Sequence, residues 1–83
     1  MDESIIFKKT AFKHHITEAA IRFALDNPVY EDLLEGFANK YLVLGHDANA
    51  NLLEILYNRI DENTIKVFHA MLCRKPWYDL AYH

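Results

Sequence analysis

The stretch Thr64–Tyr78, TIKVFHAMLCRKPWY, decides how we expect the chain to fold. Alternate positions carry Ile65, Val67 and His69, and this period of two is typical of a β-strand with one face against a core. The pattern therefore predicts that His69 points to the same side as Ile65 and Val67. Pro76 has no N–H to donate to a sheet, so the strand must end before it.

The residues before this strand predict helices followed by further strands. Thr17 is a good N-cap for a helix that Asp26–Pro28 ends. A shorter helix is expected over Lys8–His15, whereas Ser4–Phe7 fits either a short strand or the start of that helix. Apolar runs bounded by turn residues predict the remaining strands, namely Val29–Leu34, Tyr41–Leu44 and Leu52–Tyr57.

Together these segments predict a single domain over residues 1–83, of the α+β class. Two N-terminal helices are expected to pack on a three- to four-stranded antiparallel sheet. The strands follow one another as a meander because short loops join antiparallel neighbours. The tail Trp77–Tyr82 is long enough for one helical turn.

The composition is that of an ordinary globular domain, with 52% hydrophobic and 25% charged residues in 83. No apolar run approaches the ~20 residues of a membrane-spanning helix, and Asp2-Glu3 is unlike the basic start of a signal peptide. We therefore expect a cytoplasmic protein with no membrane partner. Cys73 is the only cysteine, which excludes an internal disulfide and a four-thiolate zinc site.

The charge distribution is uneven. A formal net charge of −3 argues against an indiscriminate nucleic-acid binder, because such domains are usually strongly basic. Basic residues nevertheless gather in Lys8–His15 and again at Arg74-Lys75. If these two segments meet in the fold, they form a positive patch on an acidic protein.

The histidines indicate acid–base chemistry more than metal binding. No histidine pair has the spacing of an established metal motif, so we expect no metal and no other cofactor. Cys73 is disfavoured as a nucleophile, since a strand cysteine usually packs as a small hydrophobic residue.

Histidine, arginine and lysine without a metal suit the cleavage of RNA through its own 2′-hydroxyl. That reaction needs a base, an acid, and cations that hold the charge growing on the phosphorus centre. His69 and His14 are the acid–base candidates, and Arg74 and Lys13 are the phosphate-binding candidates. Tyr78, with Trp77, is a candidate for stacking on a base.

Several short motifs point to a known family. They are Lys13-His14 with Ile16, Gly45-x-Asp47, Leu53-Glu54, and His69-Ala70-Met71 followed by Arg74 and Tyr78. Spread over most of the chain, this set resembles the small toxins of bacterial toxin–antitoxin pairs that are related to the BrnT family.

The resemblance implies a RelE-like α+β fold and a ribonuclease that a co-expressed antitoxin silences. By position it implies catalytic roles for His14, His69 and Arg74, with Lys13 and Tyr78 as secondary candidates. Lys75, next to Arg74, is a further substrate-binding candidate. The chain departs from the family in its acidic balance, and in His15, which stands where the family usually has glycine.

Two functions stay open, and a third, a nucleic-acid-binding regulator, is disfavoured by the charge balance. The first is a metal-independent ribonuclease toxin, with a cognate antitoxin and RNA, free or on the ribosome, as partners; it predicts that His14, His69 and Arg74 share one solvent-open pocket. The second is a non-catalytic protein-interaction module of the same fold. It predicts that His69 is buried and hydrogen-bonded and that Arg74 only forms an ion pair with Glu54 or Asp79. It also predicts an exposed apolar patch that includes Trp77 and Tyr82. A homodimer fits either function.

Overall fold

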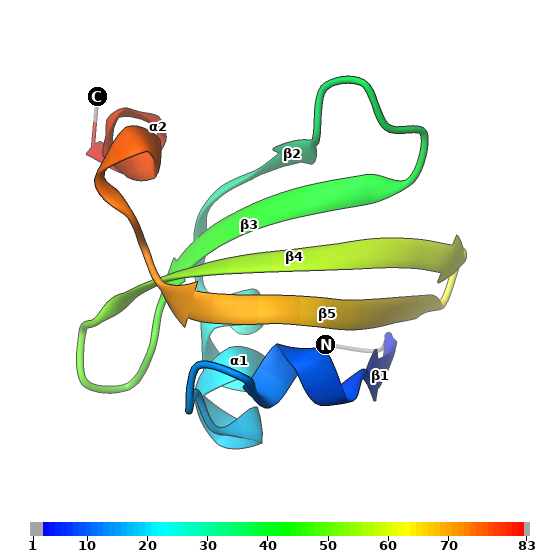
Figure 1. The fold of residues 1–83 in the computed structure, drawn as a ribbon, viewed down its shortest axis with the longest axis horizontal. Coiled ribbons are helices and arrows are strands. Elements are labelled where there is room, and N and C mark those ends of the chain that lie inside the picture. Colours follow the sequence, from blue (N-terminus) through cyan, green and yellow to red (C-terminus); the bar gives the residue numbers. More distant parts are fainter. Residues whose placement is uncertain (1–2, 83) are drawn as a thin grey trace.

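The computed structural model describes residues 3–82, and a five-stranded sheet is its central element (Figure 1). The first strand is followed by a 3₁₀ helix and an α-helix, then by four strands in succession and a short helical tail. The elements are β1 (Ser4–Phe7), η1 (Lys9–Phe12), α1 (Glu18–Asp26), β2 (Pro28–Leu33), β3 (Lys40–His46), β4 (Leu52–Asp61), β5 (Thr64–Leu72), η2 (Lys75–Trp77) and α2 (Tyr78–Tyr82).

The strands lie in the order β1-β5-β4-β3-β2. Strands β2 to β5 pair antiparallel with their neighbours in sequence, so the predicted meander is confirmed. β1 pairs with β5 in parallel, with Ile5 opposite Ile65 and Phe7 opposite Val67. The sheet is therefore mixed.

The predicted fold of two N-terminal helices on a three- to four-stranded antiparallel sheet, RelE-like, is wrong. Ser4–Phe7 is a strand because its alternate residues Ile5 and Phe7 match the apolar face of β5, whose edge is otherwise open. The expected helix over Lys8–His15 is only the 3₁₀ turn η1, which buries Ala11 alone. The second α-helix is C-terminal, in the tail where a single turn was expected.

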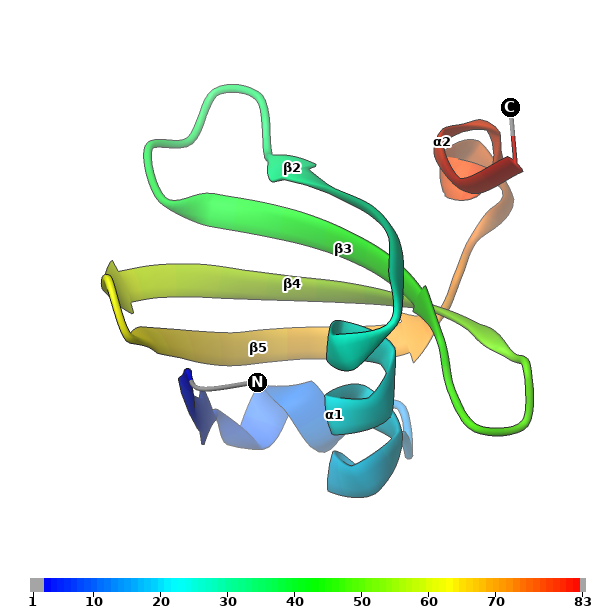
Figure 2. The ribbon, with the colours of Figure 1, turned by 180° about the vertical axis from the view of Figure 1, so that it is seen from behind.

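Helix α1 agrees with the prediction in its start and its end. The Thr17 side chain accepts a hydrogen bond from the Ala20 N–H at 3.1 Å, and the helix ends at Asp26, two residues before Pro28. Ala24 and its buried neighbours pack on one face of the sheet, which Figure 2 shows behind the helix. At Gly45 of β3 an added Cβ would lie 2.4 Å from the Ala24 carbonyl oxygen, so glycine permits this close approach.

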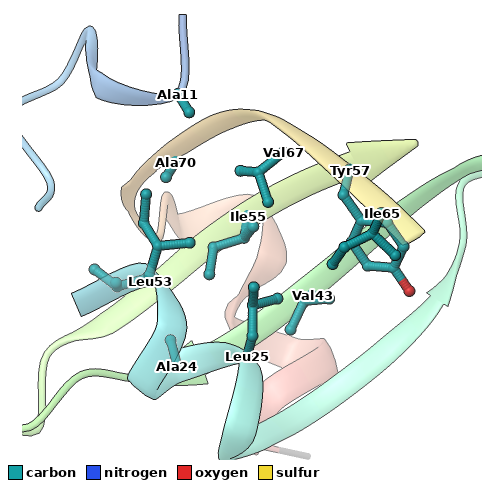
Figure 3. Packing of buried hydrophobic residues seen from close by; sticks show 11 residues of the cluster. Ala11, Ala24, Leu25, Val43, Leu53, Ile55, Tyr57, Ile65, Val67 and Ala70 are labelled. Carbon is teal, nitrogen blue, oxygen red and sulfur yellow. The ribbon is translucent and has the colours of Figure 1, made fainter. Parts of the chain in front are cut away.

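Each face of the sheet has its own apolar cluster. The first face packs against α1 and buries alternate residues of the central strands, among them Val43, Ile55 and Val67 (Figure 3). The second face carries Leu42 and Leu44, which pack against Trp77 and other residues of the C-terminal segment.

An irregularity in β5 changes the predicted direction of His69. Tyr57 pairs with Val67, but the next residue back along β4, Leu56, pairs with His69, so Phe68 is an extra residue in β5. The alternation shifts by one position at this bulge. The prediction that His69 shares a face with Val67 is therefore wrong: its partner Leu56 belongs to the cluster of the second face.

Candidate active site

A buried carboxylate on the second face organises the candidate site. Glu54, in the middle of β4, is 1% exposed and pairs across the sheet with Met71. Its Oε1 accepts hydrogen bonds from the backbone N–H and the Nε of Arg74, both at 3.0 Å. Its Oε2 accepts one from Arg74 Nη2 at 2.8 Å and lies 2.9 Å from His69 Nε2. We call these three residues, with His14, the Glu54 cluster.

These contacts keep Glu54 charged. Burial disfavours the carboxylate, but the hydrogen bonds from the side chain and backbone of Arg74, together with that from His69, outweigh it, so the pKa of Glu54 lies below its ordinary value. The hydrogen bond to Glu54 in turn raises the pKa of Arg74. The ion pair between these residues, which the interaction-module hypothesis allowed, is thus present.

Arg74 reaches Glu54 because the strand ends just before it. β5 stops at Leu72, and Arg74 is the extended residue that precedes the 3₁₀ helix η2, whose first turn contains Pro76. The guanidinium binds Glu54 through Nε and Nη2, while the side chain remains 56% exposed. Within residues 3–82, Arg74 Nη1 has no hydrogen-bond partner, and it is available to an anion from solvent.

The structure brings His14 to His69. The two rings lie 5.6 Å apart between centroids, at an interplanar angle of 74°. The Thr10 hydroxyl donates a 2.7 Å hydrogen bond to the carbonyl oxygen of Phe68, the bulge residue, which fixes η1 along the edge of β5. His14 is exposed and the His69 side chain is 20% exposed, so this part of the cluster faces solvent.

His15 turns the chain immediately after His14. Its φ of 65° lies in the left-handed region that glycine adopts most easily. This is the position where the resembled family has glycine, and the conformation explains why a glycine is suited to it.

The other predicted site residues stay outside the cluster. Lys13, Lys75 and Tyr78 are exposed, and among residues 3–82 no hydrogen bond, ion pair or ring contact joins them to Glu54, His69 or Arg74. The Tyr78 ring packs edge-on against Tyr82, with centroids 6.0 Å apart.

Glu54 lies at the centre of the candidate site, whereas the sequence pointed to it only as a motif position and as a partner of Arg74. The available signal was a lone acidic residue inside the apolar run LLEILY, because a charge at such a position is buried only when it is paired. Cys73 is buried, and desolvation followed by the charge of Glu54 raises the pKa of its thiol, which makes it a poor nucleophile.

In the described part of the chain, no three histidine, cysteine or carboxylate side chains are grouped so that they could hold a metal ion. None of the helices in residues 3–82 is long and apolar enough to cross a membrane. Comparison with known proteins adds no family: no protein-family model, no curated protein and no solved structure matches this chain.

Proposed function

We propose that this chain is a metal-independent ribonuclease that cleaves RNA by attack of the 2′-hydroxyl, and that it is the toxin of a toxin–antitoxin pair. The observation that carries the proposal is the placement of His14 and His69, which are 55 positions apart in sequence and 5.6 Å apart between ring centroids, beside an arginine held by Glu54.

The two histidines supply the acid and the base. One imidazole removes the proton of the 2′-hydroxyl, and the other protonates the 5′-oxygen as it leaves. The contact between Glu54 and His69 Nε2 orients that ring, as a carboxylate behind a catalytic histidine does. His69 Nδ1 is then the atom available for proton transfer.

Arg74 supplies the fixed cation. Binding to Glu54 through two nitrogens holds the guanidinium in one orientation, and the unpartnered Nη1 on an exposed side chain suits a phosphate oxygen. Such a preset donor stabilises charge that develops in the transition state.

The toxin role rests on the resemblance to BrnT-related toxins. Four of its motif residues, His14, Glu54, His69 and Arg74, come from distant segments and meet in one cluster. Induced expression in a bacterial host tests this role: wild-type protein should arrest growth, and His69→Ala should relieve the arrest at equal protein level. Unimpaired growth with the wild-type protein would contradict it.

Activity is tested by incubating purified protein with total RNA and with ribosome-bound RNA. We expect His14→Ala, His69→Ala and Arg74→Lys each to lower cleavage by ~100-fold or more, since general acid–base catalysis typically contributes that much. His46→Ala is the matched control, because His46 contacts Tyr82 instead of the cluster. No cleavage by the wild type on either substrate, or an equal loss in His46→Ala, would overturn the ribonuclease proposal.

One observation favours the alternative of a non-catalytic interaction module. A groove of about 450 Å³ between β2 and the C-terminal segment is lined by Trp77, Leu80 and Leu33, of which Leu33 is 43% exposed, together with the carboxylates Asp32 and Glu35. Tyr82 is also exposed. If the wild type cleaves no RNA, this groove is the surface on which we would seek a protein partner, with Leu33→Ser and Leu80→Ser as the variants that should abolish binding.

A further inference from the structure

A second groove lies on the same sheet face as the Glu54 cluster, toward the hairpin that joins β4 and β5. Its volume is about 220 Å³. Its lining residues are Lys8, Lys40, Asn58, Ile60, Lys66 and Phe68, and we call it the lysine groove.

The sheet register places the cations of the groove in one row. Lys40 pairs with Asn58, and Asn58 pairs with Lys66, so the two lysines flank the asparagine on neighbouring strands. Their Cα atoms are thus roughly 10 Å apart, twice the spacing of adjacent strands. Lys8 follows β1, which borders Lys66 on the other side. Among residues 3–82 no carboxylate forms an ion pair with any of these three lysines.

Aromatic rings accompany the lysines. Lys40 Nζ lies 4.4 Å from the centroid of the Phe37 ring and 5.8 Å from that of Phe68. Phe37 is 46% exposed, and Phe68 lines the groove. The surface therefore alternates cations with flat apolar rings.

We propose that the lysine groove binds single-stranded RNA and leads it to the Glu54 cluster. Unpaired lysines attract phosphates, and exposed rings provide stacking surfaces for bases. The proposal that the bound RNA is a substrate rests on the proposed ribonuclease function. The proposal that the groove binds a nucleic-acid strand is independent of that function.

Position along the sheet links the groove to the cluster. On the second face, the row of Asn58 and Lys66 is followed by Leu56 and His69, and then by Glu54 and Met71. Asn58 and Glu54 are four residues apart on β4, which is roughly 13 Å at about 3.3 Å per residue. A strand of RNA that lies in the groove is therefore long enough, within a few nucleotides, to reach the histidines.

An acidic peptide is the main competing ligand, and the rings argue against it. Carboxylates would use the lysines but would leave Phe37 and Phe68 without a role, whereas a base uses both. The continuity with a cluster suited to phosphate chemistry also favours RNA.

The test is a binding titration, by fluorescence anisotropy, of the full chain with labelled 2′-O-methyl oligouridine of about 12 nucleotides, a length that covers a typical single-strand site. This probe lacks the attacking hydroxyl, so binding is measured without cleavage. Affinity is recorded between about 50 and 200 mM salt.

We expect Lys66→Ala to weaken binding and to lower the slope of log K against log salt by about 0.7, the value for one phosphate contact to a single strand. Lys9→Ala, which removes the same charge from exposed η1, should leave the slope unchanged. Phe68→Leu should weaken binding about 5-fold or more with no change in slope, while Phe12→Leu, outside the groove, should have no effect. Urea unfolding of each variant confirms that it is folded.

Equal effects of Lys66→Ala and Lys9→Ala, no binding by the wild type, or equally tight binding of a labelled oligoglutamate peptide would overturn the groove proposal. Binding that depends on Lys66 and Phe68 in a protein that cleaves no RNA would support the groove and contradict the ribonuclease. RNA cleavage that is unchanged by substitution of Lys66 or Phe68 would support the ribonuclease and contradict the groove.

Discussion

The two ends of the second sheet face differ in whether their charged side chains have partners of opposite charge. At one end, Glu54 is buried and its charge is matched by Arg74 and His69. At the other end, about 13 Å along β4, the lysines of the groove have no carboxylate partner within residues 3–82. The charges at the first end are therefore held in fixed contacts within the protein, whereas the lysines at the second end are not.

Removing Arg74 should have the largest effect on stability. Arg74→Ala leaves the buried Glu54 carboxylate without its main partner, and we expect the largest fall in the free energy of unfolding among these variants, because a buried charge that loses its partner is strongly destabilising. Urea unfolding at neutral pH measures it. Lys75→Ala, which removes the neighbouring exposed cation, is the control and should change stability by no more than about 0.5 kcal/mol. Similar losses in both variants would show that Glu54 does not depend on the ion pair.

The same carboxylate should make stability depend on acid pH. The pKa of Glu54 in the folded protein is below its ordinary value of 4.5, so the unfolded chain binds the proton first as the pH falls. The stabilisation is fully present above about pH 4.5 and is lost as the pH falls through the lower folded-state pKa.

Urea titrations from neutral to acid pH, on the wild type and on Glu54→Gln, isolate this contribution. We expect the stability of the variant to decline less on acidification. Asp47→Asn serves as a comparison, because hydrogen bonds from the Asn51 and Asn49 backbones also lower the pKa of Asp47, in an exposed loop. Parallel curves for the wild type and Glu54→Gln would contradict the assignment.

A smaller effect is expected at the turn that presents His14. His15 has φ 65°, so His15→Gly removes backbone strain but adds freedom to the unfolded chain. The two effects oppose each other, and we expect a net stabilisation of at most about 1 kcal/mol. His15→Ala, which keeps the strain, should show no gain. A clear loss of stability in His15→Gly would mean that the His15 side chain itself holds the turn.

The sequence alone predicts the meander of β2 to β5 and helix α1 correctly, but it does not predict the structure of the N-terminal region. Hairpin loops and a Thr17 N-cap are local signals, whereas the pairing of Ser4–Phe7 with β5 joins segments 60 positions apart. Likewise the period of two in Thr64–Leu72 predicts the wrong side of the sheet for His69. The bulge at Phe68 shifts the alternation, and no neighbouring residue signals that bulge.

Residue type and resemblance point to His14, His69 and Arg74 as candidates but not to the residue that links them. In the structure His14 lies beside His69, and His69 and Arg74 both contact Glu54. The charge distribution suggested a positive patch formed by residues 8–15 with Arg74-Lys75. In the structure Lys8 instead lines the lysine groove with Lys40 and Lys66, which lie on other strands. Only the register of the sheet could bring those lysines together.

Removing the groove lysines should have the smallest effect on stability, in contrast to the large effect expected at Arg74. Lys40→Ala with Lys66→Ala removes two cations that lie near each other without a carboxylate partner, so we expect the free energy of unfolding to change by less than about 0.5 kcal/mol. Relief of repulsion and loss of the contact between Lys40 and the Phe37 ring act in opposite directions. Urea unfolding measures the change beside that of Arg74→Ala. A loss as large as that of Arg74→Ala would show that the lysines support the fold as Arg74 does, and the two ends of the face would no longer differ.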